Sequence, residues 1–213
     1  MEPLIDLALS HLTSTGTVGA LLVAGLHAWS VASSRRKRAA TVRAMAQVQR
    51  IYETLNEALA QVGHAGGAML LRSENGGGIP SPNRHVYSSI LHEVHSPDLD
   101  AMRESWQRVK VDAQYAELLH KLATVGHHHI VTTDLEDGAL RTMYEAQGIV
   151  CALVYAIAAD ENGFNYLSVV CTADHSDTPH NKEAARAAAS KLRGILEQRD
   201  TWLPRPLIGG ASR

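Results

Sequence analysis

A 28-residue stretch without a charged side chain is the feature that most constrains this chain. Residues 7–34 contain no Asp, Glu, Lys or Arg, and the basic block Arg35-Arg36-Lys37-Arg38 follows them directly. An apolar helix of about 20 residues is long enough to cross the roughly 30 Å hydrocarbon layer of a bilayer. A basic block beside such a helix marks its cytoplasmic end. The pattern therefore predicts a single-pass protein of the inner or plasma membrane, with the rest of the chain on the cytoplasmic side.

Three other interpretations of residues 7–34 stay open. A cleaved signal peptide carries its positive charges before the apolar run, whereas Glu2 and Asp6 precede this one. A helix buried in a soluble core or interface agrees with the modest hydrophobicity of a run that contains Gly19 and His27. A helix lying in the membrane surface needs a strongly polar face, which this run lacks.

Composition divides the chain into four parts and limits its partners. We predict an N-terminal segment with the transmembrane helix (1–34), a basic juxtamembrane and linker helix (35–62), an α/β domain (63–199) and a flexible tail (200–213).

The net charge is −2, so no overall positive field attracts nucleic acid. Basic residues beside a membrane helix suit anionic lipid headgroups. The lipid bilayer is therefore an expected partner, and nucleic acid is not.

The linker helix carries a heptad pattern. Residues 39–62 contain no Gly or Pro, and their apolar side chains recur at spacings of 4, 3, 4, 3 and 4, at Ala44, Val48, Ile51, Leu55, Ala58 and Val62. Such a seam packs either on its own domain or on a second copy of the chain, and the period alone does not separate these outcomes. We predict a homodimer, with a coiled-coil seam formed by Val48, Ile51, Leu55 and Val62.

The remaining sequence predicts an α+β domain, with an antiparallel sheet flanked by helices. Residues 149–158 form an apolar run typical of a strand covered on both faces. The turn Asp160-Glu161-Asn162-Gly163 favours a hairpin with the strand that follows. The expected strands are 68–73, 85–95, 127–132, 149–158 and 164–172, and the expected helices are 98–123, 134–148 and 182–198.

This order of elements resembles a GAF domain, a GAF/PAS-like fold. The likeness is strongest over residues 148–157, the Asp-Glu-Asn-Gly turn and residues 166–171, and it covers about residues 44–198. The resemblance implies a non-enzymatic sensory or scaffold domain that binds a small ligand and dimerises through its first and last helices. No kinase, cyclase or DNA-binding segment follows residue 198. We therefore expect the output to be a partner protein, the oligomeric state or the membrane helix.

Two alternatives accompany the sensory hypothesis. A short N-terminus, one membrane span, a helix and a compact domain are also similar to the large-domain holins of T-even phages. That likeness implies a lysis-regulating membrane protein that is toxic on expression and carries its domain outside the cytoplasm. The other alternative is a structural interaction module with a filled core and no ligand.

The candidate site is a pocket between the sheet and the helical insert. Five tyrosines of the domain are the residues expected to line it, namely Tyr87, Tyr115, Tyr144, Tyr155 and Tyr166. Packing in the core is the other role open to each of them. No catalytic signature accompanies these residues, so we predict that the protein is not an enzyme. The sequence leaves the identity of any cofactor open.

The histidines and cysteines are candidate metal ligands. Zinc needs three or four converging side chains, and the His92–His95, His127–His129 and His175–His180 pairs have no second pair at a known spacing. We predict no metal site. Cys151 and Cys171 are expected to lie near each other across the hairpin as small buried apolar residues, with a disulfide open to them only in an oxidising compartment.

Overall fold

The computed structural model describes residues 2–74, 86–160, 163–173 and 177–198, with side chains from Trp29 onward except those of Arg36 and Asp160. The chain separates into two compact units, residues 1–48 and residues 49–213. The first unit consists of helix α1 (Glu2–Gln61) up to Val48, and the last turns of α1 belong to the second unit.

No helix among the described residues is both long enough and apolar enough to span a bilayer. The transmembrane helix predicted for residues 7–34 is therefore not supported by the structure.

The second unit is built on an antiparallel sheet of six strands in the order β3-β2-β1-β6-β5-β4. The strands are β1 (Ala65–Glu74), β2 (Val86–His95), β3 (Val109–Val111), β4 (His127–Val131), β5 (Cys151–Asp160) and β6 (Gly163–Cys171). The first strand of the domain, β1, pairs with the last, β6, and these two strands form the centre of the sheet. The apolar strand expected at 149–158 and the return strand expected at 164–172 are the adjacent strands β5 and β6.

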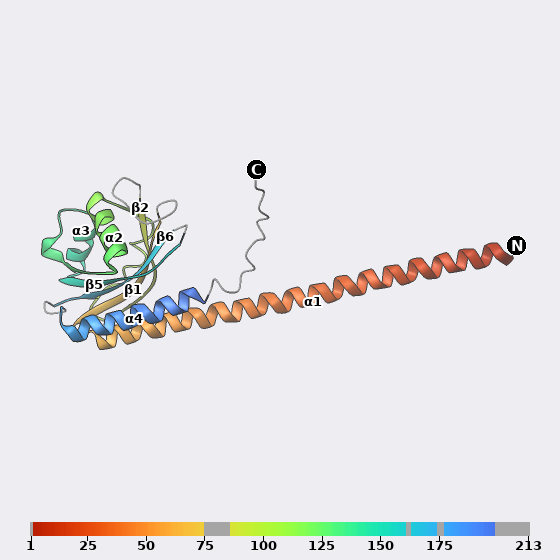
Figure 1. The fold of residues 1–213 in the computed structure, drawn as a ribbon, viewed down its shortest axis with the longest axis horizontal. Coiled ribbons are helices and arrows are strands. Elements are labelled where there is room, and N and C mark those ends of the chain that lie inside the picture. The colour runs from red at the N-terminus through yellow and green to blue at the C-terminus, as the bar shows by residue number, and fades with distance from the viewer. Residues whose placement is uncertain (1, 75–85, 161–162, 174–176, 199–213) are drawn as a thin grey trace. The chain divides into compact units, whose positions relative to one another are not determined.

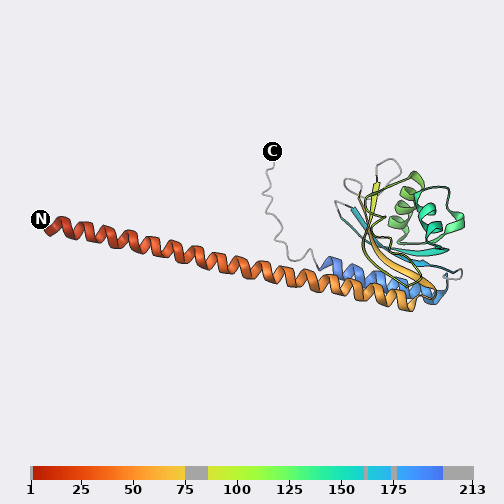
Figure 2. The same ribbon diagram turned by 180° about the vertical axis from the view of Figure 1, so that it is seen from behind.

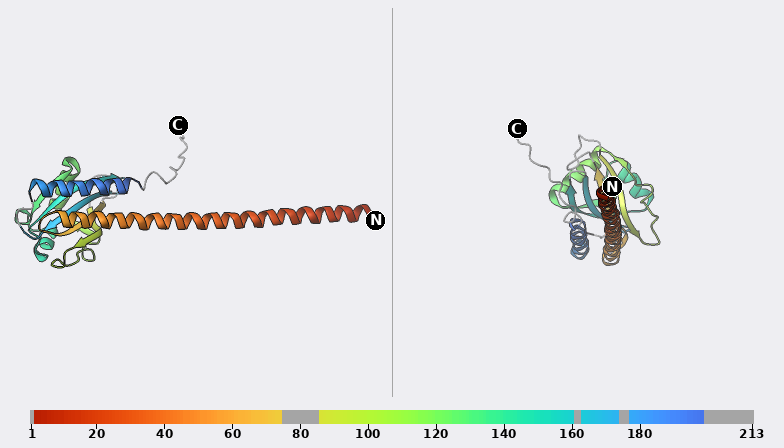
Figure 3. Two further views of the ribbon diagram at one scale, coloured as in Figure 1. Left: turned by 90° about the horizontal axis from the view of Figure 1, so that it is seen from below. Right: turned by 90° about the vertical axis from the view of Figure 1, so that its right-hand side faces the viewer.

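Helices cover both faces of this sheet (Figures 1 and 2). The end of α1 and α4 (Pro179–Glu197) pack on one face, where they lie side by side (Figure 3), with Lys191 of α4 ion-paired to Glu57 of α1. Helices α2 (Ala113–Val125) and α3 (Ala139–Ala146) lie over the other face. Because side chains alternate along a strand, Tyr166 of β6 joins the core under α2 and α3, whereas Leu167 joins the core under α1 and α4.

The heptad seam of α1 packs on its own domain. Ile51, Leu55 and Val62 are buried in the core formed with α4 and the sheet, while Val48 is 40% exposed. These three side chains are not free to contact a second copy, so their assignment to a dimer seam is corrected. The heptad spacing correctly identifies the apolar side of α1. It does not show that the sheet of the same domain, rather than a second copy of the chain, covers that side.

The predicted helix over residues 98–123 is wrong in its first half. Only residues 113–125 are helical, and β3 precedes them. Leu99, Met102 and Trp106 are all buried, and their spacing of 3 and 4 imitates a helix. The turns here depend on the side chain of Glu93, whose carboxylate accepts hydrogen bonds from the backbone N–H groups of Met102 (2.9 Å) and Arg103 (2.8 Å).

One carboxylate fixes the start of both helices over this face. Asp112 is the N-cap of α2, where its Oδ1 accepts from Tyr115 N at 2.8 Å, and its Oδ2 accepts from Ala139 N at the start of α3 at 3.2 Å. We expect Asp112→Ala to lower the free energy of unfolding by about 1–2 kcal/mol, the usual effect of losing an N-cap. Urea denaturation of the variant measures the loss, and Asp112→Asn, which keeps one acceptor, is the matched control. A loss below about 0.5 kcal/mol for Asp112→Ala, within the range of neutral surface changes, contradicts this role.

Candidate ligand pocket

A small cavity lies between the sheet and the helices α2 and α3. The volume open to the centre of a water-sized sphere is about 20 Å³, which accommodates a water molecule but not a drug-sized ligand. The sheet contributes Met69, Leu71, Ile90, Ile130, Val154, Tyr166 and Ser168 to its wall, and the segments above the sheet contribute Trp106, Tyr115, Leu118, Leu140, Met143 and Tyr144. None of these side chains carries a charge.

Two tyrosines of the wall, Tyr166 and Tyr115, form a network with buried serines of the sheet, and Tyr166 is its centre. Its hydroxyl lies 2.6 Å from the hydroxyl of Tyr115 and 2.8 Å from Oγ of Ser88, and it accepts a longer hydrogen bond of 3.5 Å from Oγ of Ser73. All four side chains are buried. Burial raises the pKa of both phenols, so they stay neutral at physiological pH. A second pair, Tyr144 and Ser168, shares another hydrogen bond.

One donor of the wall is unused. The indole Nε1–H of Trp106 is buried and has no hydrogen-bond partner; Nδ1 of His92 is the only other such side-chain atom among the residues described. Buried polar groups in folded proteins normally have a partner. The wall of the cavity therefore contains hydrogen-bonded hydroxyl groups and one side chain, Trp106, whose donor has no partner.

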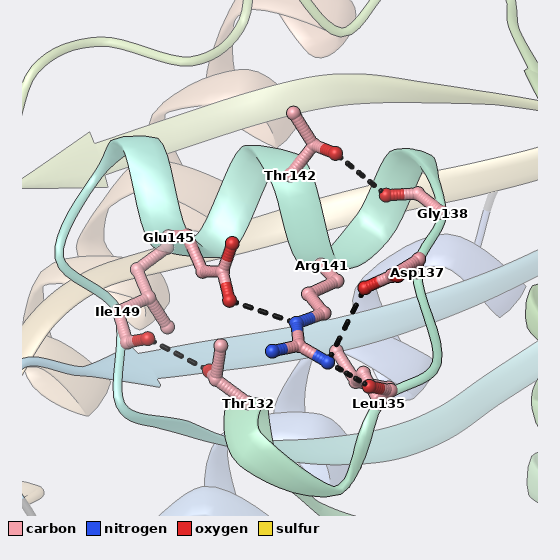
Figure 4. A network of polar contacts seen from close by, with 8 residues as sticks. All are labelled: Thr132, Leu135, Asp137, Gly138, Arg141, Thr142, Glu145 and Ile149. Atoms are coloured by element: carbon pink, nitrogen blue, oxygen red, sulfur yellow. Dashed lines mark hydrogen bonds and ion pairs between the residues drawn. The ribbon is translucent and has the colours of Figure 1, made fainter.

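Polar contacts hold the wall segment that carries α3 (Figure 4). Arg141 donates from Nε to Glu145 at 2.7 Å and from Nη1 to the carbonyl of Leu135 at 2.9 Å. The hydrogen bond to Glu145 is the largest cause that raises the pKa of Arg141. The buried hydroxyl of Thr132 donates to the carbonyl of Ile149 at 2.7 Å. These hydrogen bonds join Thr132 to Ile149 and connect α3 to Leu135 in the segment before it, and α3 contributes three side chains to the wall.

Comparison with known proteins gives matches in structure alone. No protein-family model and no curated protein matches the sequence. The GAF domain of a two-component sensor histidine kinase from Bacillus halodurans matches at 12% identity and a TM-score of 0.50, over 71% of this chain and 95% of that one. A GAF domain/HD domain protein from Geobacter sulfurreducens matches at 9% identity and 0.51, over 73% and 95%. The cyanobacteriochrome receptor PixJ matches at 7% identity and 0.52, over 74% and 99%.

This chain has a GAF-like fold. The expected antiparallel sheet flanked by helices is confirmed, and identities this low establish the fold alone. The comparisons lend no support to the likeness to holins.

The GAF-like domain brings three of the five candidate tyrosines together. Tyr115 from α2, Tyr144 from α3 and Tyr166 from β6 line the cavity. Tyr87 and Tyr155 do not. The two groups differ because alternate strand positions face opposite sides of the sheet, and a sequence without known register does not show which tyrosines share a side.

Tyr87 and Tyr155 have other surroundings. The guanidinium of Arg108 lies 5.5 Å from the centre of the Tyr87 ring on β2. Tyr155 belongs to the core under α1 and α4, where its hydroxyl donates to the carbonyl of Lys182 at 2.9 Å. Each therefore has a structural role away from the cavity.

Sequence reasoning missed Trp106 and the serines of the network. Ser88 stands between Val86 and Ile90 at i±2, and Ser168 stands between Tyr166 and Val170. A serine among such bulky side chains was the available signal. A serine on the buried face of a strand needs a hydrogen-bond partner inside the core. The partner was a tyrosine in each case.

The histidines do not form a metal centre among the described residues, where no group of three or more His, Cys, Asp or Glu side chains converges. His92 packs its ring edge-on to Tyr52 of α1, with ring centres 5.3 Å apart, and burial lowers its pKa. Nδ1 of His129 lies 4.0 Å from a carboxylate oxygen of Asp177. His175 lies outside the described residues.

The two cysteines and the basic block of residues 35–38 lie away from the cavity. Cys151 and Cys171 are direct register partners on β5 and β6 and are buried under α1 and α4. Of the basic block, Arg35, Lys37 and Arg38 are exposed on α1, and the side chain of Arg36 lies outside those described.

Proposed function

We propose that this protein is a non-enzymatic sensor whose GAF-like domain binds a small ligand between the sheet and helices α2 and α3. The observation that carries the proposal is the hydroxyl network around Tyr166 in the wall of the cavity. A core that serves stability alone favours apolar side chains, because every buried polar group must find a partner. Here Tyr115 and Tyr166, two members of the network, line a cavity in the core of the described domain.

The position of β6 suggests how binding reaches the rest of the chain. Tyr166 borders the cavity, and its neighbour Leu167 packs in the same core as Leu55 of α1. If a ligand on one face of the sheet displaces β6, the packing of α1 on the opposite face changes as well, because closely packed interiors transmit small shifts. In this proposal α1 is the output element, acting on a second copy or on a partner protein.

Thermal shift with a cavity-filling variant tests the ligand proposal. Val154 lines the cavity, and Val131 lies on the neighbouring strand outside it. A ligand at 100 times its dissociation constant adds about 2.7 kcal/mol of stability, which raises Tm by several degrees. We expect a screen of charged and uncharged small molecules to yield stabilisers whose effect is lost in Val154→Ile and kept in Val131→Ile.

A screen without stabilisers, or with stabilisers unaffected by Val154→Ile, contradicts the proposed pocket. Either result favours the structural interaction module. Enzymatic turnover of a stabiliser contradicts the non-enzymatic part of the proposal.

Dimerisation is proposed through the exposed part of α1. Val42 and Met45 of the first unit are 65% and 67% exposed, so apolar side chains lie on the surface of this part of α1. We expect Val42→Glu combined with Met45→Glu to convert a dimer into a monomer in light scattering on a sizing column. Val125→Glu is the matched control, because Val125 on α2 is equally exposed at 66%. A dimer that survives the double substitution, or a wild-type monomer, contradicts this surface.

Membrane attachment through residues 7–34 stays a prediction from the sequence. Reporters active only in the periplasm or only in the cytoplasm, fused in turn after Arg199, test it. Cytoplasmic activity in a membrane fraction supports an anchored sensor. Periplasmic activity together with toxicity on expression supports the lysis-regulating alternative. A protein absent from the membrane fraction contradicts both.

A further inference from the structure

One side chain in the wall of the cavity carries a hydrogen-bond donor without a partner. The hydroxyls of Tyr115 and Tyr166 are hydrogen-bonded to each other, and Tyr144 interacts with Ser168. Trp106 is only 4% exposed and its Nε1–H has no partner. An indole nitrogen donates and never accepts. The group that complements this unpartnered donor is therefore an acceptor.

The same wall disfavours ions. No lining side chain is charged, and the buried phenols resist ionisation because burial raises their pKa. Moving an ionised carboxylate or ammonium from water into such surroundings is very costly unless an opposite charge awaits it. Phosphates, carboxylates and amines are therefore poor candidates for this site.

The dimensions of the cavity limit the ligand further. About 20 Å³ is available before any side chain moves. Met69 and Met143 are part of the wall, and methionine repacks more readily than branched residues because its side chain is unbranched and flexible. The cavity can thus enlarge by a few heavy atoms with little cost, but not to the size of a nucleotide.

We infer that the ligand of this cavity is a small uncharged molecule whose acceptor, such as a carbonyl oxygen, takes the hydrogen bond of Trp106 Nε1. The inference rests on the proposed function and deepens it by naming the ligand class. Trp106 acts as the group that selects an acceptor, and the uncharged wall excludes the corresponding anions.

Two isosteric pairs of probes test this inference on the full chain. They are formamide and formate, and acetamide and acetate, which differ in charge at nearly constant size. The chain has three tryptophans, so a nitrogen-15 spectrum shows three indole N–H signals. Trp106→Phe removes one signal and thereby assigns it, and the signals of Trp29 and Trp202 serve as internal controls.

We expect at least one amide to move the Trp106 signal downfield and saturably, with its matched carboxylate binding at least tenfold more weakly. Trp106→Phe is expected to weaken binding of that amide about tenfold, the effect of one lost hydrogen bond. If Trp106→Phe does not fold, the comparison within each pair on the unaltered protein still decides.

Three results overturn the inference: a carboxylate that binds as tightly as its amide, an amide whose affinity is the same in Trp106→Phe, or no binding by any probe. These results are separable from failure of the proposed function. A charged stabiliser that is lost in Val154→Ile keeps the sensory proposal and removes this ligand class.

Discussion

Leu55→Ala is expected to lower the free energy of unfolding of the GAF-like domain by about 2–5 kcal/mol, the range for truncating a fully buried leucine. Leu55 is 0% exposed and belongs to the core that Leu167 of β6 and Leu192 of α4 also enter. The substitution removes three carbons at the point where α1 docks on the sheet. Urea denaturation followed by circular dichroism measures the loss.

Val48→Ala is the matched control for this prediction. Val48 belongs to the same heptad pattern but is 40% exposed, so we expect a change within about 0.5 kcal/mol. If Leu55 formed a dimer seam instead, its truncation would make unfolding depend on protein concentration. A concentration-dependent midpoint for wild type that is lost in Leu55→Ala contradicts the assignment of Leu55 to the domain core.

Tyr166→Phe is expected to cost about 2–4 kcal/mol although it removes a single oxygen atom. That oxygen is the partner of Tyr115, at 2.6 Å, and of Ser88, at 2.8 Å, and both side chains are buried. A buried polar group left without its partner costs about 1–3 kcal/mol. The substitution leaves the hydroxyl groups of Tyr115 and Ser88 in that position.

The same substitution at two other tyrosines gives values with which the stability loss of Tyr166→Phe can be compared. Tyr87→Phe, at a half-buried position outside the network, is expected to change stability by less than about 0.5 kcal/mol. Tyr155→Phe removes one hydrogen bond, to the carbonyl of Lys182, and is expected to cost about 0.5–1.5 kcal/mol. Equal effects of all three substitutions contradict a special role for the network around Tyr166.

The order of the elements was readable from the sequence because local patterns encode it. The apolar run at residues 149–158 predicted a strand covered on both faces, and β5 has helices on both. The final helix was expected at residues 182–198 and spans 179–197. Period and apolar content are properties of neighbouring residues, and a GAF-like order of elements follows from them.

The sequence alone did not determine which surfaces meet. The heptad pattern of α1 specified an apolar face, but only the folded sheet shows that Ile51 and Leu55 are covered by their own chain. The buried segment around Trp106 has helical spacing without helical structure, because the carboxylate of Glu93 stabilises turns there.

In the candidate site, too, the sequence determined some features and the tertiary structure decided others. The sequence determined that tyrosines are available, and the register of β5 and β6 decided that Tyr166 faces the cavity while Tyr155 faces α4. A shift of register by one residue exchanges the two faces of a strand. Contacts between residues far apart in the chain set that register, so the pocket and its unused donor at Trp106 belong to the tertiary structure.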